Sequence, residues 1–219
     1  MMSSTTPHQN LFQFWNTKEI PYEIEQLMRT WEVVPSFSHR IYDTKMAESY
    51  IAAHIGSRAH TAFLKCDVPA MQADFFRYCA LYHEGGVYID ADTESSGDLA
   101  SLIADEERGV LMKRQTRVAN DFLFFRHLKD PLLNRVIEQA ILNIEGRISN
   151  NVWLVTGPGI MTNMYQDEAQ RPIFDGITFR DVGIVRKIVR FRNDLEYKNS
   201  DSDWRQSLDA GSSSIFRDL

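Results

Sequence analysis

The spacing of apolar residues along the chain first indicates where helices form. Residues 21–32 carry apolar side chains at helical spacing directly after Pro21, which predicts a helix there. Its apolar positions are Ile24, Leu27, Met28 and Trp31. The strongest helical pattern covers residues 70–83 and stops at the pair Gly85-Gly86, which suits a left-handed helix end. These two segments are therefore expected to be helices that pack on a common core.

Short apolar runs typical of β-strands alternate with the helical patterns. They cover residues 11–15, 38–42, 87–89, 109–112, 122–125 and 151–155, and strand-like alternation returns over 177–192. Further helices are expected over residues 44–65, with a break near Gly56, and over 132–145. Strands that alternate with helices favour an α/β fold with a mostly parallel central sheet flanked by helices.

The length of 219 residues is enough for one domain with a full hydrophobic core. We expect this single domain over residues 11–204, between a flexible tail over 1–10 and a polar C-terminal tail over 205–219. The longest uninterrupted apolar run, Tyr78–Tyr82, is far too short for a transmembrane helix, so no transmembrane segment is expected.

The charge balance narrows the range of partners. The chain has 24 Lys and Arg against 30 Asp and Glu, a net charge of −6 that disfavours nucleic-acid binding. Cys66 and Cys79 are too few for a disulfide framework or a zinc site, so both are expected to be free thiols. The polar N-terminus and the absence of Asn-x-Ser/Thr sites predict a cytoplasmic location.

The residues with the most informative chemistry follow the expected strand over 87–89. Asp90 and Asp92 are two positions apart, so in an extended chain both carboxylates point to the same side. Carboxylate oxygens are ligands that suit Mn²⁺ or Mg²⁺. In an open α/β sheet ligands bind beyond the carboxyl ends of the strands, which is where this pair is expected. The pattern therefore predicts a divalent metal site.

The helix over 70–83 adds a second charged pair. Asp74 and Arg77 are three residues apart and lie on one face of the helix. A surface ion pair would contribute little to stability. Their neighbours are mostly aromatic or aliphatic, however, so little of this helix can face water. A half-buried pair beside an acidic metal site is better explained by a ligand that requires both residues.

Together these residues form a motif that resembles the donor-binding core of the DxD glycosyltransferases of GT-A fold. Those families carry Ala-Asp-x-x-Arg and, after a short interval, Gly-Gly-x-Tyr-x-Asp-x-Asp. The matching positions are Asp74, Arg77, Gly85, Gly86, Tyr88, Asp90 and Asp92. The segment is most similar to family 32 sugar transferases, and the clostridial glucosylating toxins share the same core. Weaker resemblances at Phe12-Gln-Phe-Trp15, Asn120 and Thr156-Gly157-Pro158 extend the likeness over residues 11–204.

The resemblance implies a metal-dependent, retaining glycosyltransferase. Such an enzyme moves a sugar from a UDP- or GDP-sugar to a glycan, lipid-linked or protein acceptor and uses Mn²⁺ or Mg²⁺. By resemblance, Asp92 and Asp90 hold the metal, Asp74 holds sugar hydroxyls, and Arg77 orients Asp74 and the donor. These four residues are the expected catalytic set. The donor contacts that the resemblance implies are Phe14, Trp15, Asp74, Arg77, Tyr88, Asp90 and Trp204.

The C-terminal part of the family pattern differs in this chain. The family often has a His or acidic metal ligand five residues before a Trp, and here Asn199 stands at that position before Trp204. Asn199 offers a carbonyl oxygen without a charge, and Asp201 or Asp203 are alternative ligands. We expect Asn199–Trp204 to fold over the diphosphate when donor and metal bind.

Two other functions use the same residues. The Asn199 difference also suits a nucleotide-sugar-binding relative without turnover. A metal-dependent phosphohydrolase is a further alternative, although such enzymes usually need a second metal or a covalent Asp. The loops over 94–108 and 114–120 carry no pattern that identifies the donor or acceptor. Arg114 and Arg117 fit either an anionic acceptor or a solvated loop.

Overall fold

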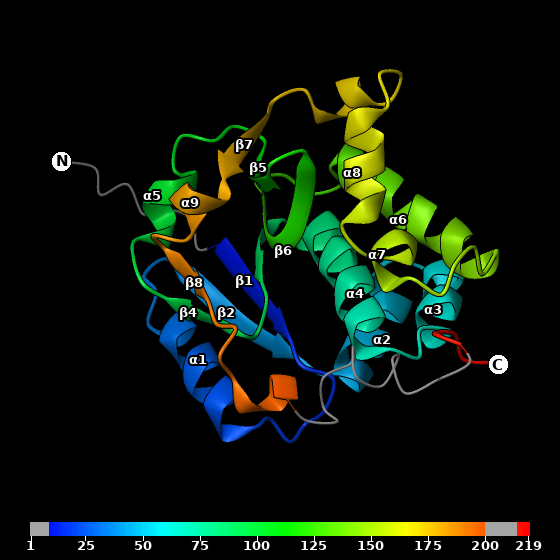
Figure 1. Cartoon of the computed structure of the whole chain (residues 1–219), viewed down its shortest axis with the longest axis horizontal. Helices are drawn as coiled ribbons and strands as arrows, with labels where there is room; N and C mark the ends of the chain where they lie inside the picture. Colours follow the sequence, from blue (N-terminus) through cyan, green and yellow to red (C-terminus); the bar gives the residue numbers. More distant parts are fainter. Residues whose placement is uncertain (1–8, 200–213) are drawn as a thin grey trace.

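The computed structural model describes residues 9–199 and 214–219, which are built around a six-stranded sheet (Figure 1). The strands are β1 (Gln9–Phe14), β2 (Phe37–Tyr42), β3 (Gly86–Ile89), β5 (Gly109–Arg114), β6 (Arg117–Phe125) and β7 (Ile177–Asp181), in the order β2-β1-β3-β6-β5-β7. β1 pairs in parallel with β2 and β3, and β5 with β7, whereas β6 is antiparallel to both of its neighbours. The predicted α/β fold with a mostly parallel sheet is confirmed.

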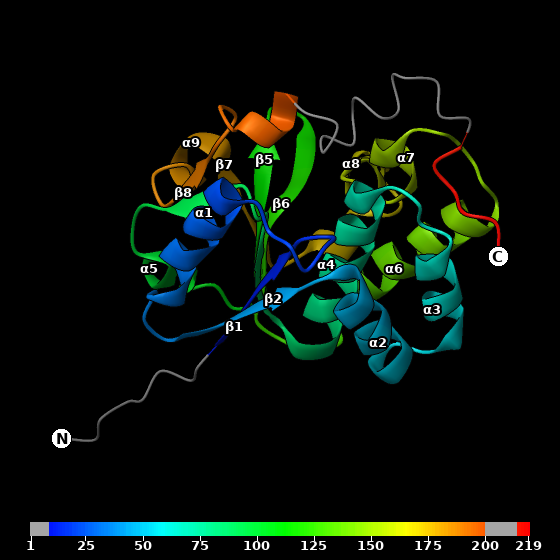
Figure 2. The same ribbon diagram turned by 90° about the horizontal axis from the view of Figure 1, so that it is seen from below.

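Helices cover both faces of this sheet (Figure 2). On one face lie α1 (Tyr22–Glu32), α5 (Leu99–Ile103) and α9 (Val182–Val185). On the other lie α2 (Thr44–His54), α3 (Ser57–Leu64), α4 (Pro69–Glu84), α6 (Pro131–Glu145), α7 (Val152–Val155) and α8 (Gly159–Gln166). Each face of the sheet therefore has its own hydrophobic core. Neighbouring residues of β1 point to opposite faces: Leu11 packs on the α1 and α5 side, and Phe12 packs on the α2 and α4 side.

Three smaller elements complete the chain. β4 (Thr93–Ser95) and β8 (Val189–Phe191) form a separate antiparallel pair, and β4 contacts α1. The 3₁₀ helix η1 covers Arg171–Phe174, and η2 covers Glu196–Asn199. β4 directly follows the predicted metal motif in the sequence. Its pairing with β8 therefore brings residues 189–191 close to that motif.

The helix α4 is buried on nearly all sides and leads straight into β3. It ends at Glu84, with Gly85 as its C-cap. Gly86 has a φ of 95°, a conformation that glycine adopts without strain. A Cβ on Gly86 would lie 2.4 Å from the backbone oxygen of Asn10, so only glycine lets β3 approach β1 this closely. The Gly-Gly pair thus places the end of β3 beside β1.

The segment 151–155 differs from its prediction. It was expected to be a strand, but Val152–Val155 is the short helix α7. Asn151 starts it, because its side-chain oxygen accepts a hydrogen bond from the Trp153 backbone N–H at 3.0 Å. A short apolar run does not by itself separate a strand from a buried helix, and here the capping residue decides.

The end of the chain also contacts the core. Ile215 and Phe216 are buried, and Phe216 forms an isolated β-bridge with Cys66. The described part of the segment expected to be a polar tail is therefore packed. Cys66 and Cys79 are buried free thiols, as predicted. Within residues 9–199 and 214–219, no helix is both long and apolar enough to cross a membrane.

Candidate functional site

The candidate site lies at the edge of the sheet where β3 ends. The Asp90 backbone N–H donates to the Asp121 carbonyl of β6 at 3.1 Å. The Asp90 carbonyl accepts hydrogen bonds from the side chains of Gln13 at 3.2 Å and Thr93 at 2.6 Å. Strands β1 and β6 and the start of β4 thus fix the backbone of the Asp-Ala-Asp motif from three directions.

Arg77 joins the helix motif to the strand motif. Its Nη2 lies 3.1 Å from Oδ1 of Asp74 and 3.1 Å from Oδ1 of Asp90, and its side chain is 5% exposed. The guanidinium also lies 4.4 Å from the ring centroid of Tyr88, a cation–π contact. Four predicted site residues therefore form one contiguous group, although they come from two different elements.

Asn120 of β6 completes this group. Its side-chain N–H₂ donates to Oδ1 of Asp74 and to the Tyr78 hydroxyl, each at 2.8 Å. Its backbone carbonyl accepts a hydrogen bond from Arg77 Nη1 at 2.5 Å. Thr156 donates to the other Asp74 oxygen at 3.4 Å. The sequence offered only a resemblance to family landmarks at Asn120 and Thr156, without a role for either. The structure shows that both hold the Asp74 carboxylate in place.

Several carboxyl groups lie close together at the site. Burial raises the pKa of Asp74, and Arg77 opposes this shift. Burial also raises the pKa of Asp90, again opposed by Arg77 and increased by Asp92 and Asp121. One buried guanidinium therefore faces several carboxyl groups, and a further cation at this place is electrostatically favoured.

A family comparison agrees with this geometry. Residues 6–108 match the family model described as a glycosyltransferase sugar-binding region containing a DXD motif. The matched stretch includes α4 and β3 together with Asp90 and Asp92. The matched stretch is just under half of the chain. The resemblance drawn from the sequence is thereby confirmed.

Two curated fungal proteins are similar to this chain. It is 31% identical over 101 residues to the initiation-specific alpha-1,6-mannosyltransferase of Schizosaccharomyces pombe, a match that covers 43% of this chain and 26% of that protein. It is 27% identical over 115 residues to the protein of the same name from Candida albicans, covering 49% of this chain and 29% of that protein. The match thus spans between a quarter and a third of each relative.

A solved structure shares the fold. The PaToxG glycosyltransferase superposes with a TM-score of 0.60 at 17% sequence identity, covering 77% of this chain and 73% of that one. At this identity the match concerns the fold alone, and it supports the GT-A assignment of this chain.

The two carboxylates are suited to a hard divalent cation. Lys198 Nζ lies 2.6 Å from Oδ2 of Asp92, so this carboxylate already contacts a positive charge. The donor set of Asp90 and Asp92 oxygens also suits Mn²⁺ or Mg²⁺. Among the described residues no cluster of three or more His, Cys, Asp or Glu side chains forms a larger metal site. The predicted roles of the Asn199 side chain and of Trp204, with closure over 199–204, lie outside what the structure describes.

The aromatic residues predicted to bind the donor have different surroundings. Phe14 is 5% exposed and packs against the Phe76 ring at 5.9 Å, inside the core. Trp15 is half-buried and packs on a small cluster that includes Ala91 and Leu195. Tyr88 is fully buried, and no hydrogen-bond partner for its hydroxyl lies within the described part of the chain. Of the three, Trp15 retains exposed ring surface next to the Asp-Ala-Asp motif.

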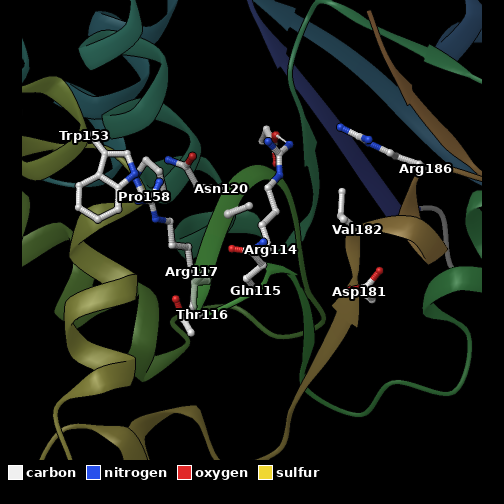
Figure 3. Close-up of a pocket in the computed structure, with 13 residues that line it drawn as sticks. Arg114, Gln115, Thr116, Arg117, Asn120, Trp153, Pro158, Asp181, Val182 and Arg186 are labelled. Atoms are coloured by element: carbon white, nitrogen blue, oxygen red, sulfur yellow. Dashed lines mark hydrogen bonds and ion pairs between the residues drawn. The ribbon is translucent and has the colours of Figure 1, made fainter.

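A pocket of about 690 Å³ opens beside this site, at the turn between β5 and β6 (Figure 3). We call it the hairpin pocket. Its polar and aromatic lining comprises Arg114, Arg117, Asn120, Trp153, Asp181 and Arg186. Asn120 belongs both to the pocket wall and to the Asp74–Arg77 group, so the two sites are adjacent. Sequence reasoning identified Arg114 and Arg117 but not Trp153 or Arg186.

Proposed function

We propose that the protein is a metal-dependent, retaining glycosyltransferase that uses a nucleotide-diphosphate sugar. The observation that carries the proposal is the Asp74–Arg77–Asp90 group at the edge of the sheet, with the Asp92 carboxylate beside it. The retaining stereochemistry in this proposal rests on the resemblance to the family 32 sugar transferases. The proposed reaction breaks the bond between the sugar C1 and the diphosphate oxygen and forms a bond from C1 to an acceptor hydroxyl oxygen. The hydroxyl proton leaves with the diphosphate.

Each residue of the group has a proposed task. Asp90 and Asp92 hold the divalent cation, and a bound Mn²⁺ or Mg²⁺ would supply positive charge to the departing diphosphate. Asp74 accepts hydrogen bonds from hydroxyls of the donor sugar. Arg77 holds the Asp74 and Asp90 carboxylates at a fixed separation, because one nitrogen contacts both. Asn120 and Thr156 orient Asp74 through its two oxygens.

The nucleotide is proposed to lie at the end of β1. The half-buried ring of Trp15 offers a flat apolar surface for the base, next to Ala91. In the same proposal the Tyr88 ring holds the Arg77 guanidinium by a cation–π contact, and Phe14 contributes only through its packing in the core. Asn199 and Trp204 complete the site as in the family pattern. Because both fungal relatives are named mannosyltransferases, GDP-mannose belongs in the first donor panel beside UDP-sugars.

The test is donor binding in the presence and absence of Mn²⁺. A thermal-shift screen of UDP- and GDP-sugars should show at least one donor that raises the melting temperature only with Mn²⁺. Asp92→Asn should abolish this shift and leave the unliganded melting temperature nearly unchanged, because the Asp92 side chain is partly exposed at a strand end. Asp105→Asn, an exposed carboxylate change after α5, is the matched control.

The outcomes separate the proposed enzyme from its alternatives. Metal-dependent donor binding together with release of free sugar or transfer supports a transferase. Donor binding without any turnover would instead favour a binding protein. An Asp92→Asn variant that keeps Mn²⁺-dependent donor binding would contradict the metal assignment.

A further inference from the structure

Arginines are concentrated around the hairpin pocket, although the chain as a whole is acidic. Arg114, Arg117 and Arg186 line it against the two carboxylates of Asp121 and Asp181, whereas the whole chain has a net charge of −6. Figure 3 shows Arg117 with Trp153 on one side and Arg186 on the opposite side, with the turn of the hairpin between them. The pocket is thus a locally basic cavity on an acidic protein.

Two of these arginines have no acidic partner in the described structure. Arg114 forms an ion pair with Asp121, and the Asp181 side chain accepts from the Gly183 backbone N–H at 2.8 Å. For Arg117 and Arg186, by contrast, residues 9–199 and 214–219 provide no ion pair. A guanidinium presents a planar set of donors that matches a carboxylate or a phosphate. Two such groups facing one cavity indicate an anionic ligand.

The tryptophan in the wall indicates what else the ligand contains. The guanidinium of Arg117 lies 5.8 Å from the Trp153 ring centroid, which places charge and aromatic surface side by side. A partly exposed Trp offers a large rigid surface with an apolar face. A sugar ring fits such a surface through its C–H face, whereas a free phosphate ion would gain nothing from it.

The pocket also lies where a second substrate has to bind. Asn120 lines it and holds both Asp74 and Arg77, and the Asp121 carbonyl binds the Asp90 backbone N–H. A molecule in the pocket is therefore next to the proposed donor site. Its volume of about 690 Å³ is within the range of small-molecule sites.

We propose that the hairpin pocket binds the acceptor, and that this acceptor is a saccharide bearing a carboxylate or phosphate group. Arg117 contacts the anionic group, Trp153 beside it contacts the sugar ring, and Arg186 adds positive charge from the opposite side of the pocket. The role as acceptor site rests on the proposed glycosyltransferase function. Binding of the anionic sugar itself requires neither donor nor metal. The acceptor proposal can therefore be disproved while the glycosyltransferase proposal holds, and the reverse.

The experiment measures sugar binding to the full chain by saturation-transfer difference NMR, without donor or metal, and measures inorganic phosphate by its displacement of the bound sugar. The probes are glucuronic acid, glucose 6-phosphate, glucose and inorganic phosphate. Either anionic sugar should bind at least about tenfold more tightly than glucose, since hydrogen bonds to charged groups are the stronger ones. The identity of the tighter binder distinguishes a carboxylate from a phosphate. Inorganic phosphate should bind more weakly than the preferred anionic sugar.

The variants assign the effect to the two arginines. The double variant Arg117→Gln, Arg186→Gln should lose the preference for the anionic sugar, whereas Arg135→Gln on the exposed side of α6 should keep it. Glucose or inorganic phosphate binding as tightly as the preferred anionic sugar would overturn the proposal. It would also be overturned if the double variant lost affinity for UDP and GDP while its binding of anionic sugars stayed unchanged, because the arginines would then serve the donor.

Discussion

Lys198 and Asp92 form an ion pair at the place where the metal is proposed to bind. The Nζ and Oδ2 atoms are 2.6 Å apart, and the two side chains are 11% and 23% exposed. The ammonium is further held by the Arg192 carbonyl at 2.5 Å. A divalent cation that binds Asp92 must therefore compete with this ammonium.

The first prediction concerns that competition. Lys198→Met removes the ammonium and keeps most of the aliphatic side chain, so Mn²⁺ should bind several-fold more tightly than to the wild type. Isothermal titration calorimetry with MnCl₂ alone measures this, without donor or acceptor. Lys187→Met, an exposed change in the turn before β8, is the control and should leave the affinity unchanged. Equal Mn²⁺ binding by Lys198→Met would show that the lysine does not compete with the metal, and weaker binding would show that it assists it.

A second prediction follows from the burial of Asp74 and Arg77. Removing Arg77 leaves the buried Asp74 and Asp90 carboxyl groups without their shared cation, so Arg77→Ala should lower the free energy of unfolding by about 3–5 kcal/mol. Asp74→Ala should cost less, because Arg77 keeps Asp90 as a partner. The double variant should lose clearly less than the sum of both. Urea denaturation measures all three. The exposed pair Arg29–Glu25 is the matched comparison, and Arg29→Ala should cost far less than Arg77→Ala. Additive losses at Asp74 and Arg77 would show that the two do not act as a unit.

A third prediction tests Asn120. Asn120→Ala leaves Asp74 and the Tyr78 hydroxyl without their donor, and we expect a loss of about 1–3 kcal/mol in the free energy of unfolding. Asn120→Asp has nearly the same shape but places a second carboxyl against Asp74, so it should be the more destabilising of the two. Asn134→Ala on the exposed face of α6 serves as the reference. A milder effect of Asn120→Asp than of Asn120→Ala would contradict the assigned hydrogen bonds.

A fourth prediction concerns pH. Burial lowers the pKa of His39 from 6.5 to about 4, and its Nε2 lies 2.8 Å from the Gln13 side-chain oxygen. Below about pH 6.5 the unfolded chain takes up a proton that the folded chain does not accept until about pH 4. The free energy of unfolding should therefore fall across this window as the pH drops, by at most about 1.4 kcal/mol per pH unit from this residue.

The comparison with His39→Gln isolates that effect. The raised pKa values of Asp74 and Asp90 act in the opposite direction in both proteins, so they cancel in the difference between them. Wild-type stability minus variant stability, from denaturation between pH 4 and pH 7, should decrease towards pH 4. A difference that does not vary with pH would contradict the assignment.

The long periodic segments were predictable from the sequence. The helix expected over 70–83 is Pro69–Glu84, and that over 132–145 is Pro131–Glu145. Both have a proline at the start and a glycine after the end, which are local signals. The helix over Val152–Val155 was missed because four apolar residues fit either structure, and the cap at Asn151 was not recognised as decisive.

The candidate site was predictable only in part. Asp74, Arg77, Asp90 and Asp92 lie within one stretch of sequence, so their spacing and a family motif identified them. The contacts of Asn120 with Asp74 and of Lys198 with Asp92 join residues far apart in the chain. Such pairs depend on the order of strands in the sheet and on the return of the chain after β8. Neither is encoded in a local pattern.

The fixed backbone of Asp90 has a thermodynamic consequence. Its carbonyl is held by Gln13 and Thr93, and its N–H by the Asp121 carbonyl, before any ligand arrives. A cation that binds the adjoining carboxylates therefore meets a preorganised loop and does not have to order it. The conformational entropy lost on binding should be small, and so should the accompanying change in heat capacity, since little apolar surface becomes buried.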